Sequence, residues 1–418
     1  MFGAFILLLI AFSIVLALPK QARKPFLLSM TARLAISVAN VVSGGNMIGA
    51  DFDANTFFSK AVYLSANIES LDWNLLSLVN GTTLFINVHA LVQFLLGGPE
   101  FLLAHAFSLL GAAIGLWLLN QIWLLIFPQD KKYLKWLILL YTFYPSVLMY
   151  QSYILREVWQ NICILGLGWL ALKIKAEGWS LMRSLALAIF LLFGSLLHNA
   201  MPLVMVILLF IILFASSIGL KKFLFSSSLS RFLTWIILLP VLIVILSGLF
   251  LPLVRQSAFF DSLSEGRLLE RTEQYGKSGL INARAEYGNL FFANQPLTII
   301  PTFLAYELMP LPPRIRTPTD VIAFIQNLFR VWLIWVYWRY RNHVDRNTRN
   351  SLSLLFLMWL VVDVIYATGT INWGTASRHH IKSFALLLVS GLGVWSRFKE
   401  NLTIRKNLVV LGSDRSGK

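Results

Sequence analysis

The stretch FLLAHAFSLLGAAIGLWLLNQIWLLIF, residues 101–127, contains no Asp, Glu, Lys or Arg and decides the fold class. At about 1.5 Å per residue, a helix of this length crosses the roughly 30 Å hydrocarbon core of a bilayer. Similar apolar runs recur along the chain, which is 57% hydrophobic and 13% charged, with a mean hydropathy of +0.72. Because soluble proteins carry about 25% charged residues, the sequence predicts an integral membrane protein and excludes a soluble one.

The predicted fold is all-α, a polytopic integral membrane protein of about ten transmembrane helices with extracytoplasmic amphipathic loop helices. Residues 1–418 are expected to form a single transmembrane domain, with extracytoplasmic loops at about 51–100 and 253–319. Residues 34–50 and 83–96 are short and only partly apolar. They are more typical of interfacial or re-entrant segments than of full crossings. The alternative is that residues 34–50 cross, which the preference of Lys20, Arg23, Lys24 and Arg33 for the inside would require.

Basic residues set the orientation that we expect for these helices. They fall in five segments: Lys131, Lys132 and Lys135; Lys173, Lys175 and Arg183; Lys221, Lys222 and Arg231; Arg339, Arg341, Arg346 and Arg349; and Arg397, Lys399, Arg405 and Lys406. Lys and Arg in short loops favour the cytoplasmic side, so four helical hairpins turn outside. These turns are expected near residues 153–157, 198–202, 255–320 and 369–382. Topology thus explains the net charge of +16, and nucleic-acid binding is not expected.

Two carboxylates stand one residue apart in Gly49-Ala50-Asp51-Phe52-Asp53, in an expected outer loop. Such a pair can bind a divalent cation that bridges phosphate oxygens, or one carboxylate can act as a general base. A solvated loop is the alternative. If the chain uses a metal ion, we expect Asp51 and Asp53 to bind it.

Two other outer turns place ionisable groups beside apolar helices. Tyr153-Ile154-Leu155-Arg156-Glu157 carries adjacent opposite charges, and His198-Asn199 lies between two apolar runs. Because a bilayer penalises such groups, they indicate candidate ligand contacts. The alternatives are an ion pair that caps the hairpin and a histidine that lies at the interface.

Two arginine-bearing segments favour an anion site. Pro310-Leu311-Pro312-Pro313-Arg314-Ile315-Arg316 is a stiff turn with two guanidinium groups, and Asn372-Trp373-Gly374-Thr375-Ala376-Ser377-Arg378-His379-His380 ends an expected crossing. Arginine binds phosphate through paired hydrogen bonds, and a neighbouring histidine, here His379, can protonate a leaving oxygen. Interfacial turns with snorkelling charges are the alternative.

Several standard motifs are absent from the sequence. It has no Walker-type glycine loop, no spaced Cys/His zinc pattern, no His-Glu-x-x-His helix and no Gly-x-Ser-x-Gly elbow. The single cysteine, Cys163, allows no disulfide within one chain. These absences argue against a nucleotide-driven pump and a standard membrane metalloprotease.

The order of features resembles that of polytopic GT-C glycosyltransferases, the class that includes bacterial relatives of dolichyl-phosphate-mannose protein mannosyltransferases. The matching features are the acidic residues 50–53, the stretch 85–106 with Gly97-Gly98-Pro99-Glu100, the Tyr144-Pro145-Ser146 step and the Leu155-Arg156-Glu157 turn. Residues 309–316 and 372–379 also resemble membrane proteins of bacterial exopolysaccharide and O-antigen gene clusters.

This resemblance implies a division of roles. In the GT-C class an acidic residue of the first outer loop activates the acceptor hydroxyl or helps to place a metal ion, and the donor is a polyprenyl-phosphate-linked sugar. It implies Asp51 or Asp53 as the catalytic base. It implies contacts to the donor phosphate by Arg156, Arg314, Arg316 and Arg378. We expect His379 at the reaction centre, with Glu157, His198 and His380 in support.

The expected function is that of a glycosyltransferase of cell-envelope polysaccharide synthesis in the bacterial inner membrane, with its site facing outward. Its donor would be an undecaprenyl-phosphate-type or pyrophosphate-type glycan, used to add one sugar or to join repeat units. Expected partners are membrane lipid, the polyprenyl-linked donor, a glycan acceptor and other polysaccharide assembly proteins. The rival hypotheses are a flippase for lipid-linked glycan that forms no bond and a non-catalytic scaffold.

Overall fold

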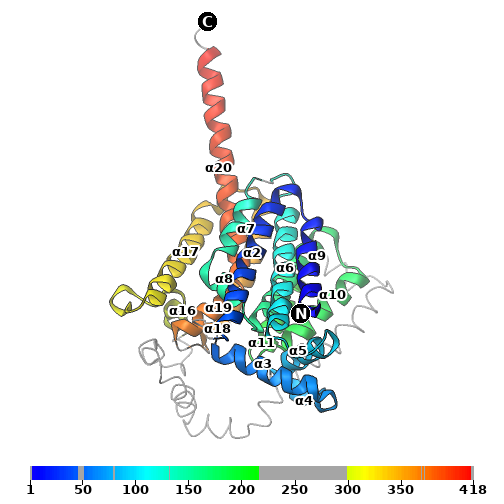
Figure 1. The fold of residues 1–418 in the computed structure, drawn as a ribbon. Helices are drawn as coiled ribbons and strands as arrows, with labels where there is room; N and C mark the ends of the chain where they lie inside the picture. The colour runs from blue at the N-terminus through cyan, green and yellow to red at the C-terminus, as the bar shows by residue number, and fades with distance from the viewer. Residues whose placement is uncertain are drawn as a thin grey trace, which may run out of the picture.

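The computed structural model describes residues 2–45, 51–78, 81–130, 132–215, 299–368, 370 and 372–415. These residues are almost entirely helical and contain no β-strand, so the predicted all-α class is confirmed (Figure 1). The basic segment at 221–231 and residues 253–298 of the second expected loop lie outside the described residues.

Four described helices are long and apolar enough to cross a membrane. They are α2 (Lys20–Val42), α6 (Phe101–Ile126), α17 (Pro318–Tyr340) with the following 3-10 turn η7 (Arg341–His343), and α18 (Arg346–Thr368). A fifth span results if α19 (Trp373–His380) and α20 (Phe384–Arg415), which meet at a bend of 66°, are taken together. The chain therefore has the character of a membrane protein.

The remaining described elements are shorter or carry more polar residues. They are α1 (Phe2–Ser13), η1 (Ile14–Ala17), α3 (Asp51–Ala66), η2 (Ile68–Ser70), α4 (Leu75–Leu78), α5 (Thr83–Leu95), α7 (Leu134–Thr142), α8 (Pro145–Tyr150), α9 (Glu157–Glu177), α10 (Leu181–Ser195), α11 (Met201–Ala215), α16 (Ile299–Leu308) and η6 (Pro312–Arg314). Helices α10 and α11 have 15 residues each, whereas a crossing normally needs about 20. The described helices therefore provide four or five spans by length, fewer than the predicted ten.

Helix α6 lies at the centre of the bundle and packs against α1, α2 and α9, while α20 packs against α17 and α18. Gly111 makes the contact between α6 and α9 possible, because a Cβ atom there would lie 2.7 Å from Val158 Cγ1. Small residues at such contacts let helix backbones approach closely in membranes. The result is a bundle whose centre is almost closed to solvent.

The N-terminal quarter differs from the sequence-based expectation. Helix α2 begins at Lys20 and continues through Arg33, so residues 34–42 belong to a long helix rather than a short interfacial segment. Arg33 is fully buried and donates to Ser29 Oγ and, at 3.0 Å, to Gln151 Oε1. Partners elsewhere in the chain satisfy its buried polar residues. Asp53 likewise lies in the first turn of α3, where a negative charge is favourable, rather than in a loop.

The described basic segments gather at one end of the bundle, which we call the basic end. Three contacts join them: Lys175 Nζ donates to Ser351 Oγ at 3.0 Å, Asn401 Nδ2 donates to His343 O at 2.9 Å, and the Arg397 guanidinium lies 4.8 Å from the Phe127 ring centroid. Helices α3 and α4 lie at the opposite end, away from the projecting part of α20 (Figure 1). We call this opposite end the site end.

Candidate functional site

Arg378 joins three segments of the chain at the site end. Its Nε donates to Glu157 Oε1 at 2.8 Å, and its Nη1 donates to Asp53 Oδ2. The Glu157 side chain is only 2% exposed, whereas that of Asp53 is 42% exposed. Asp53, Glu157 and Arg378, with the adjacent Arg156, form what we call the end cluster. The sequence analysis named all four residues, and the structure brings them together.

Local backbone features place each member of the end cluster. Glu157 is the first residue of α9, where its charge complements the helix dipole. The Asn372 side chain caps the short helix of Arg378 by accepting from the Thr375 backbone N–H at 2.8 Å. Arg156 Nη1 donates to the carbonyl of Gly81 at 2.6 Å. Gly81 has a φ of +73°, a conformation that side chains other than glycine rarely adopt.

The predicted histidines lie beside the end cluster. His379 and Thr370 share a hydrogen bond of 2.9 Å between Nδ1 and Oγ1, and the His379 ring centroid is 5.9 Å from that of His198. His198 Nδ1 accepts from the Ala200 backbone N–H at 3.1 Å. Burial, reinforced by the positive charges of Lys382 and Arg156, holds the pKa of His198 well below its usual range. These surroundings favour the neutral ring, and because Nδ1 accepts a hydrogen bond, the proton of that ring lies on Nε2.

Lys382 lies in the break between α19 and α20 and did not enter the sequence-based prediction. Its side chain is fully buried, and its Nζ sits 3.7 Å from the Tyr366 ring centroid. Asn161 Nδ2 donates to the backbone carbonyls of Ile381 and Lys382, both at 3.0 Å. The amide of one helix thus holds the break of another in a defined position.

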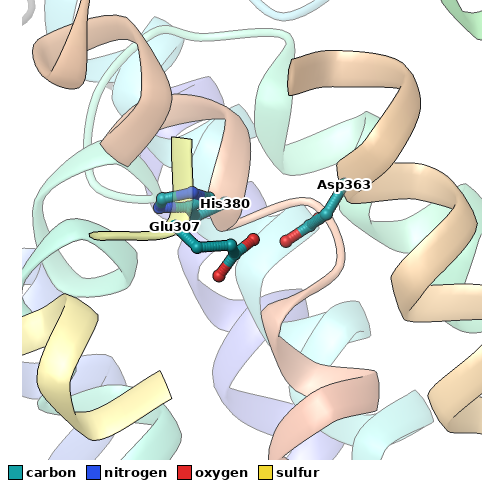
Figure 2. A group of neighbouring side chains, drawn as sticks. All are labelled: Glu307, Asp363 and His380. Atoms are coloured by element: carbon teal, nitrogen blue, oxygen red, sulfur yellow. The ribbon is translucent and has the colours of Figure 1, made fainter. Parts of the chain in front are cut away.

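A second ion group lies inside the bundle and consists of Glu307, Arg330, Asp363 and the neighbouring His380, which we call the buried network. Arg330 Nη2 donates to Glu307 Oε1 at 2.7 Å and to Asp363 Oδ2. Figure 2 shows the two carboxylates pointing toward one another, with the His380 ring beside Glu307. His380, expected to support the outer site, therefore belongs to this inner group.

Asp363 has donors on both of its oxygens. Trp359 Nε1 donates to Oδ2 at 2.9 Å, and the Ser383 hydroxyl donates to Oδ1. Arg330, Glu307 and Asp363 are all at most 3% exposed. Burial of ions is tolerated when they are paired and hydrogen-bonded in this way.

Neither the buried network nor the end cluster is well suited to bind a metal ion in its present arrangement. Ligand atoms of Glu307, Asp363 and His380 lie within 4.8 Å of one another, but the Arg330 guanidinium already binds both carboxylates and would repel a cation. In the end cluster, the Arg378 guanidinium likewise already binds the Asp53 carboxylate. The side chain of Asp51, the other predicted metal ligand and candidate base, lies outside the described residues.

Arg314 and Arg316 form a third group at the start of α17. The Arg316 backbone N–H donates to Asp320 Oδ2 at 3.1 Å, and Trp373 Nε1 donates to Asp320 Oδ1 at 3.0 Å. Asp320 therefore attaches the proline-rich turn to the first residue of α19, the helix that carries Arg378. The Arg316 side chain is exposed.

An apolar groove of about 590 Å³ runs between α7 and α17. Its walls include Phe143, Ile322 and Ile325, and its polar lining is small. Ile322 also lines a neighbouring pocket of about 600 Å³ beside Arg316. The apolar groove and the cationic pocket therefore adjoin each other at Ile322.

The sequence analysis missed Glu307, Arg330, Asp363 and Lys382. Arg330 and Asp363 were detectable, because each is an isolated charge inside an apolar run, and such residues are costly unless they have partners or a function. Nothing in the local sequence indicated that Glu307 would be their partner. Lys382 lies only two residues after His380, but its burial depends on Asn161 of α9 and Tyr366 of α18, which the local sequence does not reveal.

Comparison with known proteins does not identify a family for this chain. No protein-family model, no curated protein and no solved structure matches the chain, so the interpretation of the site rests on its own chemistry.

Proposed function

We propose that the chain is an integral membrane glycosyltransferase of bacterial cell-envelope polysaccharide synthesis. Its donor is a sugar or oligosaccharide linked to polyprenyl phosphate or pyrophosphate, bound on the outer face of the inner membrane. The observation that carries the proposal is the apolar groove between α7 and α17, which adjoins the pocket beside Arg316. A lipid-linked donor needs such a pair of sites, one for its hydrocarbon tail and one for its anionic headgroup.

The end cluster supplies the chemistry in this proposal. Asp53 takes the proton of the acceptor hydroxyl, and the acceptor oxygen attacks the anomeric carbon of the donor sugar. The bond from that carbon to the phosphate oxygen breaks, and its electron pair leaves on the phosphate. Arg378 binds Asp53 and Glu157 and so holds the Asp53 carboxylate in a fixed orientation. The acceptor is a glycan, and the product is either one added sugar or a joined repeat unit.

The proposal includes about ten membrane crossings, with the site end outside. Helix α9 has 21 residues, and the short apolar helices α1 with η1, α5, α10 and α11 add further segments that approach crossing length. Because Cys163 is the only cysteine and is buried, a Cys163→Ala background leaves no native thiol. Lys60→Cys at the site end is expected to react with a membrane-impermeant maleimide in intact spheroplasts, whereas Lys132→Cys at the basic end reacts only after lysis. The opposite pattern would invert the proposed orientation.

Reconstitution tests the activity directly. Purified protein in liposomes, supplied with lipid-linked glycan extracted from the source cells, is expected to form a new glycosidic bond that mass spectrometry detects in the product. Empty liposomes provide the control for spontaneous transfer. Movement of glycan across the bilayer without a new bond would contradict the transferase proposal.

One observation favours the alternative of a flippase for lipid-linked glycan. The buried network places Arg330 and Asp363 inside two membrane-spanning helices, and charges inside a bundle are typical of transport pathways. The exposed carboxylate of Asp53 and the groove beside Arg316 favour transfer chemistry at one face instead. The same liposome experiment separates these functions.

A further inference from the structure

We infer that Lys382 contacts the donor phosphate in addition to the pocket beside Arg316; the family resemblance implies this role for Arg156, Arg314, Arg316 and Arg378, but not for Lys382. This inference rests on the proposed function, because it assumes a donor that carries phosphate. The environment of Arg378 is the first observation that supports it. Arg378 binds two carboxylates, those of Asp53 and Glu157, so its charge is already compensated. Arg378 is thus better suited to position Asp53 than to bind a further anion.

The Lys382 ammonium group has no comparable partner. Its side chain is fully buried, and Nζ has no hydrogen-bond acceptor among the described residues. An ammonium group has three donors, and burying it without acceptors is strongly unfavourable. The contact with the Tyr366 ring at 3.7 Å satisfies only part of this requirement. A ligand with several acceptor oxygens would satisfy the rest.

The charged neighbours of Lys382 also favour an anion. Two carboxylates, Glu157 and Asp363, attract Lys382, but each is already bound to an arginine, Arg378 and Arg330 respectively. Arg156 and Arg378 lie close enough to add to the positive potential around Lys382, and a phosphate group would offset it.

Lys382 lies close to a helix N-terminus. Lys382 lies at the 66° break before α20, so the N-terminus of that helix begins two residues away, at Phe384. Helix N-termini at broken membrane helices bind anionic groups through their N–H dipoles. Asn161 holds the carbonyls of this break, so the geometry exists before a ligand binds.

Two more donors in the same region lack hydrogen-bond partners among the described residues. They are the hydroxyl of Tyr366, whose ring lies against Lys382, and Nε of Arg156. Buried donors without acceptors are uncommon in folded proteins and point to an absent ion or water. Lys382 Nζ, the Tyr366 hydroxyl and Arg156 Nε are therefore the groups that we assign to phosphate oxygens.

The test uses the full-length protein in lipid nanodiscs and measures its melting temperature and its affinity for phosphate ligands. Lys382→Met removes the ammonium group while keeping a side chain of similar length. Without ligand this variant is expected to melt at a higher temperature than the wild type, because a buried group without acceptors is removed. Its affinity for undecaprenyl phosphate in the disc is expected to fall roughly tenfold to a hundredfold, as for loss of a hydrogen bond to a charged group.

Matched variants sharpen the interpretation. Lys175→Met makes the same change at the basic end, where the lysine already bonds to Ser351, and it should leave phosphate affinity unchanged. Tyr366→Phe removes one buried hydroxyl and should weaken binding several-fold without loss of fold. Discs without polyprenyl lipid, titrated with inorganic pyrophosphate, separate a lipid headgroup from a free anion. A Lys382-dependent effect with either ligand supports the anion site.

Several results would contradict the assignment of Lys382 to the donor phosphate. If Lys382→Met melts at a lower temperature, fails to fold or binds undecaprenyl phosphate as the wild type does, Lys382 is a structural partner of its carboxylate neighbours and the inference is wrong. The proposed transferase would remain in that case. If the wild type binds neither undecaprenyl phosphate nor pyrophosphate, the donor class itself is wrong, and both proposals fail.

Discussion

Replacing Arg330 by methionine is expected to destabilise the protein by about 3–5 kcal/mol, the cost of leaving buried charges without their partner. Arg330 is fully buried and binds both Glu307 and Asp363, and its removal leaves two carboxylates inside the bundle without a cation. The free energy of unfolding in mild detergent, measured by chemical denaturation, checks this. Arg339→Met, an exposed change on the same helix, is the control and should have little effect.

A compensated variant tests the cause of that loss. Combining Arg330→Met with Glu307→Gln and Asp363→Asn removes all three charges while keeping similar side-chain volumes. Most of the lost stability should return, because neutral groups cost less to bury than unpaired ions. If the triple variant is no more stable than Arg330→Met, packing of the guanidinium rather than charge pairing explains the effect.

Asp53→Asn is expected to reduce the rate of glycosyl transfer by about 10²- to 10⁴-fold, the usual contribution of a general base. The fold should be retained, because Asp53 is partly exposed and Arg378 keeps its hydrogen bond to Glu157. The liposome assay gives the rate, and size-exclusion chromatography checks the fold. Glu69→Gln, an exposed carboxylate in the same site-end segment, is the matched control.

A rate for Asp53→Asn within about threefold of the wild type would contradict its role as the base, since that change is far below the effect of losing general-base catalysis. Asp51→Asn would then be the variant to compare, because the acidic pair remains the candidate motif. Loss of folded Asp53→Asn protein would instead show that the contact with Arg378 is mainly structural.

The sequence predicted the parts of the structure that depend on local composition. Apolar runs indicated helices, and basic segments indicated one common end, which the contact between Lys175 and Ser351 illustrates. The four residues of the end cluster were also identified, because each lies at the edge of an apolar run. The role of each residue is still a proposal.

Features that depend on pairing between distant helices were not predictable. The burial of Arg33 within α2 was one such feature, because its partner, Gln151, lies 118 residues away. The same reason explains why the pairing of Glu307 with Arg330 was missed, since these two residues come from different helices. Hydropathy counts each charge as a cost and does not reveal which charges neutralise one another.

The bonds of Arg378 also set an order for assembly of the protein during membrane insertion. Arg378 lies 325 residues after Asp53 and 221 residues after Glu157, both of which leave the ribosome long before it. Until the C-terminal helices are inserted, the Glu157 carboxylate has no guanidinium partner. The arrival of α19 therefore completes the ion pairs that join the first and last parts of the chain.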